Sequence, residues 1–467
     1  MEFRKTKCSH EGCDLPAIRG SAECVLHSPN PDKSASTFTD ALAGLGSHED
    51  YLDYSGITFP SAFPKDFFAE RTIAGLSLED SVLHCEFWLS NTTFAGPVNF
   101  FGAEFNAPVT ITQTTFEEEC NFGAGLDTLL LQNCVFIGEA YFAYLVAVKS
   151  AYFESSKFKA WADFTEMDAG DVAMFYDLTF CGETNFRGAT FSTARFHKVR
   201  FEDNVSFRSC LVAQKMTLDD CHFGKALDFR SVEQRRDASL GFRSADFSNA
   251  LLTGTDLRRI DLEDIKWREV ETSRSRRRAL VEECENVHFD GQVFEAGFYE
   301  FSKATVGQLE LAYRQLKRVG DTSGDHELAG EFHIGEMEMK RRQVPWARVD
   351  RYPLEGYRLV SLYGERWLRP LLLVLSLALI VAVADMAFGV TIAGRGIHYG
   401  LTGAFAGWVV LADLGRCLVH AAQVVTLQRP TDVVFSDGSR AVAVFGSILG
   451  PILIAFLALA LKERLKR

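Results

Sequence analysis

The chain lacks the short motifs that mark the common classes of enzyme active site. It contains no glycine-rich phosphate loop, no strained Gly-x-Ser-x-Gly turn for a nucleophilic serine, and no carboxylate pair at a spacing typical of acid–base catalysis. The sequence therefore predicts a protein that is not an enzyme.

An apolar run of the kind that a secretory signal needs is also missing at the beginning of the sequence, MEFRKTKCSHEGC. The 11 cysteines share no repeated spacing outside a short N-terminal motif. We therefore expect the soluble part to stay in a reducing compartment, where scattered thiols remain unpaired and pack as small apolar groups.

Basic side chains are scarce relative to acidic ones. The chain has 49 Lys and Arg against 62 Asp and Glu, a net charge of −13. The residues from Arg369 onward carry an excess of basic side chains, so the acidic surplus belongs to the part before them. An acidic surface opposes binding to a phosphate backbone, and we expect no nucleic-acid partner.

Phenylalanine, in contrast, is abundant, with 39 residues. Large apolar residues recur every five positions in three long runs, which are Phe63, Phe68, Ile73, Leu78, Leu83 and Trp88; Phe186, Phe191, Phe196 and Phe201; and Phe242, Phe247, Leu252, Leu257, Leu262 and Trp267. A period of five fits neither a helix nor a strand, and it requires a turn after every few residues, as in a solenoid. The alternative is an irregular, Phe-rich all-β domain.

Two segments come closest to a known repeat: Ala245-Asp246-Phe247-Ser248-Asn249 and Ala250-Leu251-Leu252-Thr253-Gly254. They resemble the pentapeptide-repeat family, whose loose pattern places a small residue two positions before a large one. The resemblance implies a mainly β fold over residues 57–303, a right-handed quadrilateral β-helix with four pentapeptides per coil. With four pentapeptides per coil, Phe63 to Trp267 would make about ten coils, stacked at roughly 4.8 Å.

The N-terminal motif, within residues 1–33, contains the possible metal ligands Cys8, Cys13, Cys24 and His27, with His10 as a spare candidate. Thiolate and imidazole at this finger-like spacing are the ligands of tetrahedral Zn²⁺. Four protein ligands leave no open position, so we predict a structural zinc site. The alternatives are unrelated cysteines in a disordered tail and a catalytic zinc.

Two further segments separate the repeat from the membrane part. The insert 268–286 carries Arg274, Arg276, Arg277 and Arg278, which would either lie in a solvated loop or contact anionic lipid or an acidic partner. Residues 304–343 have helical periodicity on both sides of a Gly-rich break and predict a helical hairpin. His333 and Glu336 within it are a weak metal candidate.

Residues 345–467 form the predicted membrane domain. Residues 371–392 and 441–461 are each long and apolar enough to span the bilayer, and 352–367 predicts an amphipathic helix at the interface. Basic residues flank the outer ends of the pair, which places both chain termini and the β-helix in the cytoplasm. Asp385 would lie near the far end of the first span, where it would reach water or pair with an arginine.

The segment between the two spans predicts a re-entrant, pore-like piece over residues 412–430. Together with the repeats, this layout resembles a bacterial group in which pentapeptide repeats join a two-helix, potassium-channel-like domain. The loop Val424, Val425, Thr426, Leu427 and Gln428 departs from that group, because potassium selectivity needs a glycine-containing filter and no glycine lies between Arg416 and Gly438. Gly446, Gly450 and Pro451 would permit close helix packing and a bend.

These expectations define two candidate functions. The first is a homo-oligomeric, ion-channel-like protein of the bacterial inner (plasma) membrane, not selective for potassium, with a cytoplasmic β-helix that senses a signal or directs assembly. The second is a membrane-anchored scaffold that binds a protein partner on the β-helix and conducts no ions.

Overall fold

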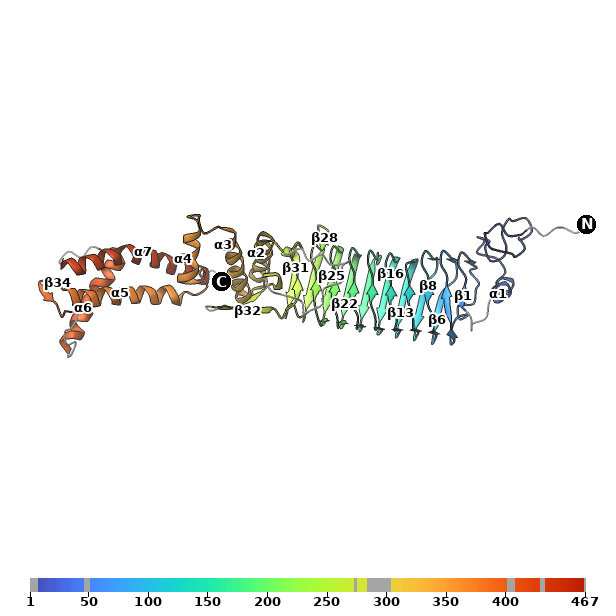
Figure 1. Cartoon of the computed structure of the whole chain (residues 1–467), viewed down its shortest axis with the longest axis horizontal. Helices are drawn as coiled ribbons and strands as arrows, with labels where there is room; N and C mark the ends of the chain where they lie inside the picture. The colour runs from blue at the N-terminus through green and yellow to red at the C-terminus, as the bar shows by residue number, and fades with distance from the viewer. Residues whose placement is uncertain are drawn as a thin grey trace, which may run out of the picture. The chain divides into compact units, whose positions relative to one another are not determined.

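The computed structural model describes residues 7–45, 51–272, 275–283, 304–400, 408–428 and 433–465. The chain forms two compact units, Met1–Ser323 and Gly324–Arg467. The first unit contains a stack of β-coils, and the second contains helices (Figure 1).

Parallel strands of the first unit form three sheets that run along the stacked coils. The first sheet consists of β1 Tyr51–Asp53, β4 Gly75–Ser77, β8 Val98–Asn99, β12 Cys120–Asn121, β15 Ala140–Tyr141, β18 Ala162–Asp163, β21 Thr184–Asn185, β24 Val205–Ser206, β27 Leu227–Asp228 and β30 Ala250–Leu251. The second contains β2 Thr58–Phe59, β5 Val82–Leu83, β6 Phe87–Ser90, β9 Glu104–Phe105, β10 Val109–Thr112, β13 Gly125–Gln132, β16 Val146–Glu154, β19 Val172–Tyr176, β22 Thr190–His197, β25 Leu211–Asp219, β28 Glu233–Gln234, β29 Ser239–Arg243 and β31 Ile260–Glu263. The third contains β3 Thr72–Ile73, β7 Thr93–Phe94, β11 Thr115–Phe116, β14 Val135–Phe136, β17 Lys157–Phe158, β20 Thr179–Phe180, β23 Arg200–Phe201 and β26 His222–Phe223.

These sheets make a β-solenoid of about ten turns, as the sequence predicts. The second sheet covers two sides of a coil: the start of β13 pairs with β9 and its end pairs with β10. One coil therefore offers four strand positions.

The coils are longer than four pentapeptides, which corrects the predicted repeat. Ala140, Ala162 and Thr184 occupy equivalent positions in consecutive coils, so each of these coils has about 22 residues. The step from the third sheet to the first takes six residues, as from Phe136 to Phe142 and from Phe158 to Phe164. These six-residue steps interrupt the period of five and explain why the sequence shows it only in fragments.

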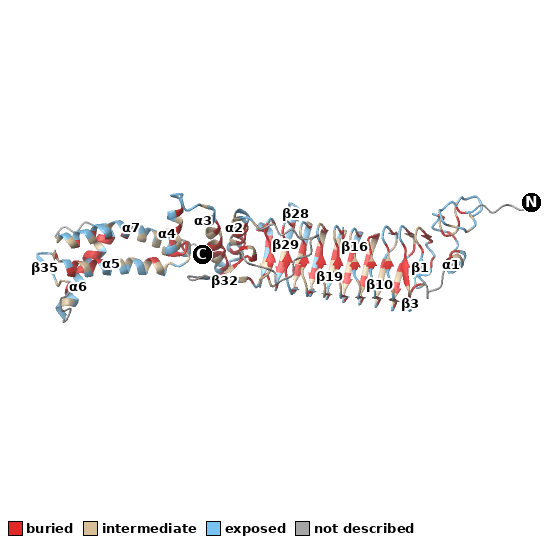
Figure 2. Ribbon diagram, viewed as in Figure 1, coloured by how far each residue is buried: buried red, intermediate tan, exposed pale blue. Residues whose placement is uncertain are grey.

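Phenylalanine rings stack from coil to coil and form the core, which Figure 2 shows as the buried strip inside the solenoid. In the third sheet, Phe136, Phe158 and Phe180 stack with ring centroids 4.6 Å apart. A second column next to the first sheet runs through Phe122, Phe142, Phe164, Phe186, Phe207 and Phe229, at 4.6–4.9 Å. This spacing equals the distance between neighbouring strands, so each ring continues the column as the coils repeat.

Helices and loops cover both ends of the solenoid. At the N-terminal end, α1 Ala35–Ala43 begins at the Ser34 cap and places Phe38 against Phe59 and Phe63, with ring centroids 5.2 and 5.6 Å away. At the C-terminal end, the short helices η1 Leu257–Arg259 and η2 Val281–Glu283 precede α2 Val306–Ser323. Terminal caps of this kind protect the open edges of a repeat protein.

The insert predicted as a loop is a β-hairpin, β32 Arg268–Thr272 and β33 Ser275–Ala279. Arg277 is buried rather than solvated: its guanidinium donates to both carboxylate oxygens of Glu283 at 2.6 Å. Tyr313 of α2 donates to Glu283 at 2.5 Å and accepts the Leu280 amide. Arg274 and residues 284–303 of the predicted β-helix lie outside the described residues.

The second unit begins with α3 His326–Gln343 and α4 Arg351–Ser361. The helix α4 covers most of the predicted interfacial segment 352–367, and Glu355 on it accepts from Arg341, Arg351 and Arg358. The segment 304–343, predicted to form a helical hairpin, contains two helices, α2 in the first unit and α3 in the second.

The remaining elements of the second unit are α5 Leu368–Phe388, β34 Val390–Ile392, β35 Arg395–Ile397, α6 Trp408–Val425, β36 Val433–Phe435 and α7 Asp437–Leu465. Among the described residues, α5, α6 and α7 are long and apolar enough to cross a membrane. The predicted span 371–392 is too long at its end, because Gly389, with a φ of +94°, ends the helix and residues 390–392 form a strand.

Candidate metal centre and membrane segment

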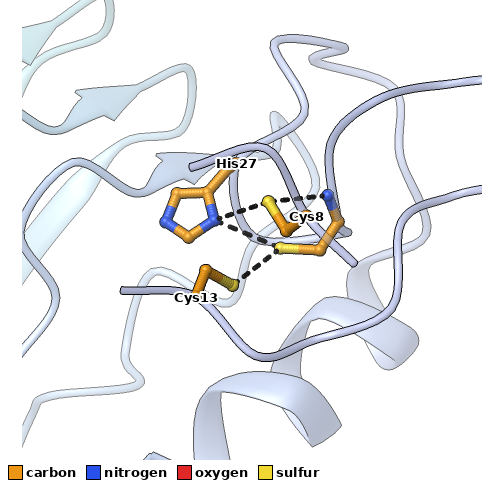
Figure 3. A group of neighbouring side chains, drawn as sticks. Cys8, Cys13 and His27 are labelled. Atoms are coloured by element: carbon orange, nitrogen blue, oxygen red, sulfur yellow. Dashed lines mark hydrogen bonds between the residues drawn. The ribbon is translucent and has the colours of Figure 1, made fainter. Parts of the chain in front are cut away.

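The four predicted metal ligands meet in the loop before α1. Figure 3 labels three of them, Cys8, Cys13 and His27. The sulfur atoms of Cys8 and Cys24 lie 3.5 and 3.2 Å from Nδ1 of His27, and those of Cys13 and Cys24 lie 3.7 Å apart. All four ligand atoms lie within 4.8 Å of one another. One tetrahedral ion with bonds of about 2.0–2.3 Å would reach every one of them.

The local backbone explains why residues up to 19 positions apart converge. Gly12 and Gly20 turn the chain at φ values of +80° and +88°, which favour glycine. The amide of Cys8 donates to the Leu15 carbonyl at 3.0 Å, and the amide of Cys24 donates to the Cys8 sulfur at 3.3 Å. The loop is therefore closed by its own hydrogen bonds around the cluster.

Electrostatics favour a neutral imidazole at His27. Burial lowers the pKa of His27, and the nearby His10 and Lys33 lower it further. The spare candidate His10 is not a fifth ligand; its ring stacks on His27, with centroids 4.0 Å apart. Burial raises the pKa of the Cys13 thiol to about 11, so binding a cation there would release a proton.

The metal loop is attached to the first coil of the solenoid. The carbonyl of Leu26 accepts the Thr58 amide at 3.0 Å and the Lys33 ammonium at 3.2 Å. The same ammonium donates to the Ser28 carbonyl at 2.8 Å. A metal ion here would order the end cap, and the four protein ligands would leave it no open position for a reaction.

The weaker metal candidate on α3 remains a pair. Nδ1 of His333 lies 3.7 Å from a carboxylate oxygen of Glu336, one turn away. In the described part of the chain, only the Cys8 cluster brings three or more potential ligands together.

The predicted pore-like residues lie at the end of α6, which packs against both α5 and α7. Val424 and Val425 are helical and buried, whereas Thr426, Leu427 and Gln428 are exposed on the single chain. A Cβ at Gly450 would collide with the backbone of Val425. Residues 429 and 430 of the predicted segment lie outside the described residues.

Gly446 also permits a close approach in the middle of α7. A Cβ at this position would lie 3.0 Å from Val381 of α5 and 3.3 Å from Val424 of α6. The three helices therefore meet closely at Gly446 and Gly450, the two glycines predicted to pack helices, and Pro451 follows inside α7.

Both ends of the connection between α5 and α7 lie in one small sheet. Strand β34, which follows α5, pairs with β35 and with β36, which precedes α7. Asp413, in the N-terminal half of α6, makes a polar contact beside this sheet: its carboxylate accepts from Arg395 of β35, from Tyr399 and from Arg416.

Asp385 neither reaches water nor pairs with an arginine. It is fully buried, and its Oδ2 lies 2.8 Å from Nδ1 of His420 on α6, which is also buried. The sequence analysis missed His420. A histidine inside an apolar helix was the available signal, but its partner lies 35 residues away in the chain.

This protein thus combines a β-solenoid, a Cys₃His cluster and a unit whose helices are apolar enough to span a membrane. Comparison of the chain with protein-family models, with curated proteins and with solved structures finds no match. The pentapeptide-repeat assignment therefore remains a resemblance based on the residues quoted for it.

Proposed function

We propose that this chain is a membrane-anchored, oligomeric, ion-channel-like protein in which α5 and α7 span the bilayer and α6 is re-entrant. In this proposal, the β-solenoid lies in the bacterial cytoplasm, where it binds a protein partner or directs assembly. The protein would not select potassium, since the residues after α6 lack the glycine of such filters.

One observation carries the re-entrant placement of α6. Pairing of β34 with β36 brings both ends of the connection to the same end of the α5–α7 pair. The C-terminal end of α6 nevertheless lies beside Gly450, 13 residues into α7. At 1.5 Å per residue this position is about 20 Å along the helix, so the chain would enter the bilayer and return to the same side.

The need for several copies follows from the surroundings of residues 426–428. They are not helical and are exposed on the single chain. Irregular backbone at membrane depth is unfavourable against lipid, and it is tolerated where protein or a water-filled path surrounds it. A ring of several copies of this chain would surround residues 426–428 with protein on one side and a water-filled path on the other.

The charge pattern supports the orientation. Arg366, Arg369, Lys462 and Arg464 lie at the ends of α5 and α7 that are opposite to the small sheet. Basic residues favour the cytoplasmic side, which places the sheet and the N-terminal half of α6 on the far side.

Electrical recording from the purified full chain in planar bilayers tests this function. We expect discrete currents in several salts, lost in Gly450→Leu because a side chain there separates α6 from α7. The matched control is Gly415→Leu, since a Cβ at Gly415 meets nothing within 4 Å. Silence of the wild type in every salt, with oligomers intact by cross-linking, would exclude a channel.

The non-conducting scaffold is the second candidate, and one observation favours it. The carbonyl of Val424 accepts the Leu427 amide at 3.2 Å, and the carbonyl of Val425 lies against Gly450 of α7, so neither carbonyl faces a path. A silent wild type that still captures a protein partner through the solenoid would establish this function instead.

We further propose that the Cys₃His cluster holds one Zn²⁺ in a structural role. Three thiolates and one imidazole suit this ion better than magnesium or calcium, which prefer oxygen ligands. The attachment of the loop to the first coil supports a role in capping the solenoid.

A further inference from the structure

The buried pair Asp385–His420 has polar atoms that the fold does not use. Both side chains are 1% exposed, and one hydrogen bond of 2.8 Å joins them. Within the described residues, the second carboxylate oxygen of Asp385 and Nε2 of His420 have no hydrogen-bond partner. Buried polar atoms are normally paired, so two unpaired atoms in one contact require an explanation.

Apolar groups form most of the surroundings of the pair. The ring of Phe435 lies 5.3 Å from that of His420. Cys417 and Ala421 on α6 and Val381, Ala382 and Met386 on α5 belong to the same buried cluster. A net charge on the pair would therefore be poorly solvated.

The other titratable side chains near the Asp385–His420 pair either are uncharged or interact with other residues. On α6, the Cys417 thiol interacts with Asp385, and Asp413 is neutralised by Arg395 and Arg416. From the hairpin side, Tyr399 donates to Asp413, and His398 approaches Gly389. Among the described residues on these elements, Asp385 and His420 are therefore the groups that balance each other's charge.

We propose that Asp385 and His420 form a proton-binding site that holds α6 against α5 and releases it when the proton count of the site changes. One proton shared between an ionised Asp385 and a neutral His420 leaves a charge of −1. A second proton, taken from water onto Nε2 of His420, makes the pair neutral. Removing that proton, or adding a third to Asp385, leaves an uncompensated buried charge, which separates the two helices.

The site joins one proposed span to the proposed re-entrant helix, so its effect on ion flow rests on the proposed function. Proton binding itself does not: it requires only the contact between α5 and α6. A direct measurement of the movement of α6 therefore tests the proton-binding site. Topology mapping or electrical recording separately tests the proposed channel-like function.

Hydrogen–deuterium exchange of the full chain in lipid nanodiscs, from pH 5 to pH 9, tests the proposal. After correction for intrinsic exchange rates, wild-type amides of residues 413–425 should be most protected at an intermediate pH. At pH values below and above this maximum, protection of these amides should fall by about tenfold, because gain or loss of a proton creates a buried charge on the pair. Helices α3 and α4, which belong to the same unit as the pair, serve as an internal reference for correct folding.

In the two single variants, the protection of α6 amides should change with pH in opposite directions. In His420→Gln the isolated carboxyl is neutral only when protonated, so protection of α6 should rise toward acidic pH. In Asp385→Asn the isolated imidazole is neutral only when deprotonated, so protection should rise toward alkaline pH. Combining both substitutions should remove the dependence, whereas the exposed control His398→Gln should behave as wild type.

A wild-type protection profile that is flat with pH would overturn the proposal. So would the same pH dependence in the wild type and the double variant, because some other group would then be responsible. A variant whose helical unit does not fold would be recognised from exchange of α3 and α4, and each single variant tests the sign of its own pH dependence.

Discussion

Cys13 is the member of the metal cluster that can be replaced with least disturbance, since it is partly exposed whereas Cys8 and Cys24 are buried. We expect Cys13→Ser to lower the zinc content of the purified full chain from near one ion per chain to none. Inductively coupled plasma mass spectrometry measures this content. Cys181→Ser, at a partly exposed cysteine outside the cluster, should keep its zinc.

Loss of the metal should also loosen the first coil, because Leu26 beside the ligand His27 accepts the amide of Thr58. Faster amide exchange at β2 in Cys13→Ser, with unchanged exchange at β22, is the expected pattern. A wild-type protein free of metal after purification without chelators would contradict the zinc site.

Glu282 shows how a buried carboxylate closes the last coil. Its Oε1 accepts the amides of Leu252 and Thr253 at 2.7 and 2.9 Å. Glu282→Ala would leave both amides without this acceptor, at a cost of about 1–3 kcal/mol for each that stays buried and unpaired. Exchange of the amides in residues 250–263 should accelerate accordingly, while Glu263→Ala, at an exposed position of the same coil, should have little effect.

The titration of Glu282 has a defined sign. Burial raises its pKa above the ordinary value of 4.5, although the amides of Thr253 and Leu252 oppose the shift. The folded state therefore binds more protons than the unfolded state in this range, so stability falls as the pH rises from 4.5 through the folded pKa. Glu282→Gln keeps an acceptor and should flatten this part of the stability profile, as measured by amide exchange of the last coil.

At the scale of elements, the phenylalanine columns and the parallel backbone ladders both join neighbouring coils. Phe158 is fully buried and stacks on Phe136 and Phe180 at 4.6 Å. Phe158→Ala should cost about 3–5 kcal/mol, since it leaves a cavity in a column that cannot collapse. Because each coil contacts only its neighbours, the loss should increase amide exchange mainly in β14, β17 and β20.

Phe101→Ala is the matched control, because this ring is 47% exposed on the surface of the same solenoid. Its effect should stay within about 0.5 kcal/mol. Equal effects of the two substitutions would contradict a core built from stacked rings.

For the molecule as a whole, the helices of the second unit provide the apolar surface that a membrane would cover. Large apolar side chains are exposed along α5, such as Leu372, Leu375 and Ile380, and along α7, such as Phe445 and Ile448. The full chain should therefore remain in the membrane pellet after alkaline carbonate extraction, whereas a chain ending at Ser323, the end of the first unit, should be recovered in the aqueous fraction.

Topology reporters test the number of spans. With two spans and a re-entrant α6, a reporter fused after Gly400 should report the far side, and reporters at either terminus should report the cytoplasm. Termini on opposite sides would instead mean that α6 crosses the bilayer as a third span.

The sequence by itself determined the features that depend on local spacing. Large apolar residues at intervals of five predict a solenoid, runs of more than 20 apolar residues predict membrane helices, and Cys8, Cys13, Cys24 and His27 predict one cluster. Each follows from geometry within a short segment, where the period of side chains or the reach of a tight turn limits the outcome.

Only the tertiary structure decided the features that depend on partners distant in the chain. The registers between coils set the coil length at about 22 residues. Arg277 is buried because Glu283 and Tyr313 meet it, and Asp385 is paired because α6 brings His420 beside α5. The free energy of a buried charge depends on what surrounds it in space. For that reason, the same arginine or aspartate read in sequence alone is equally consistent with a solvated position.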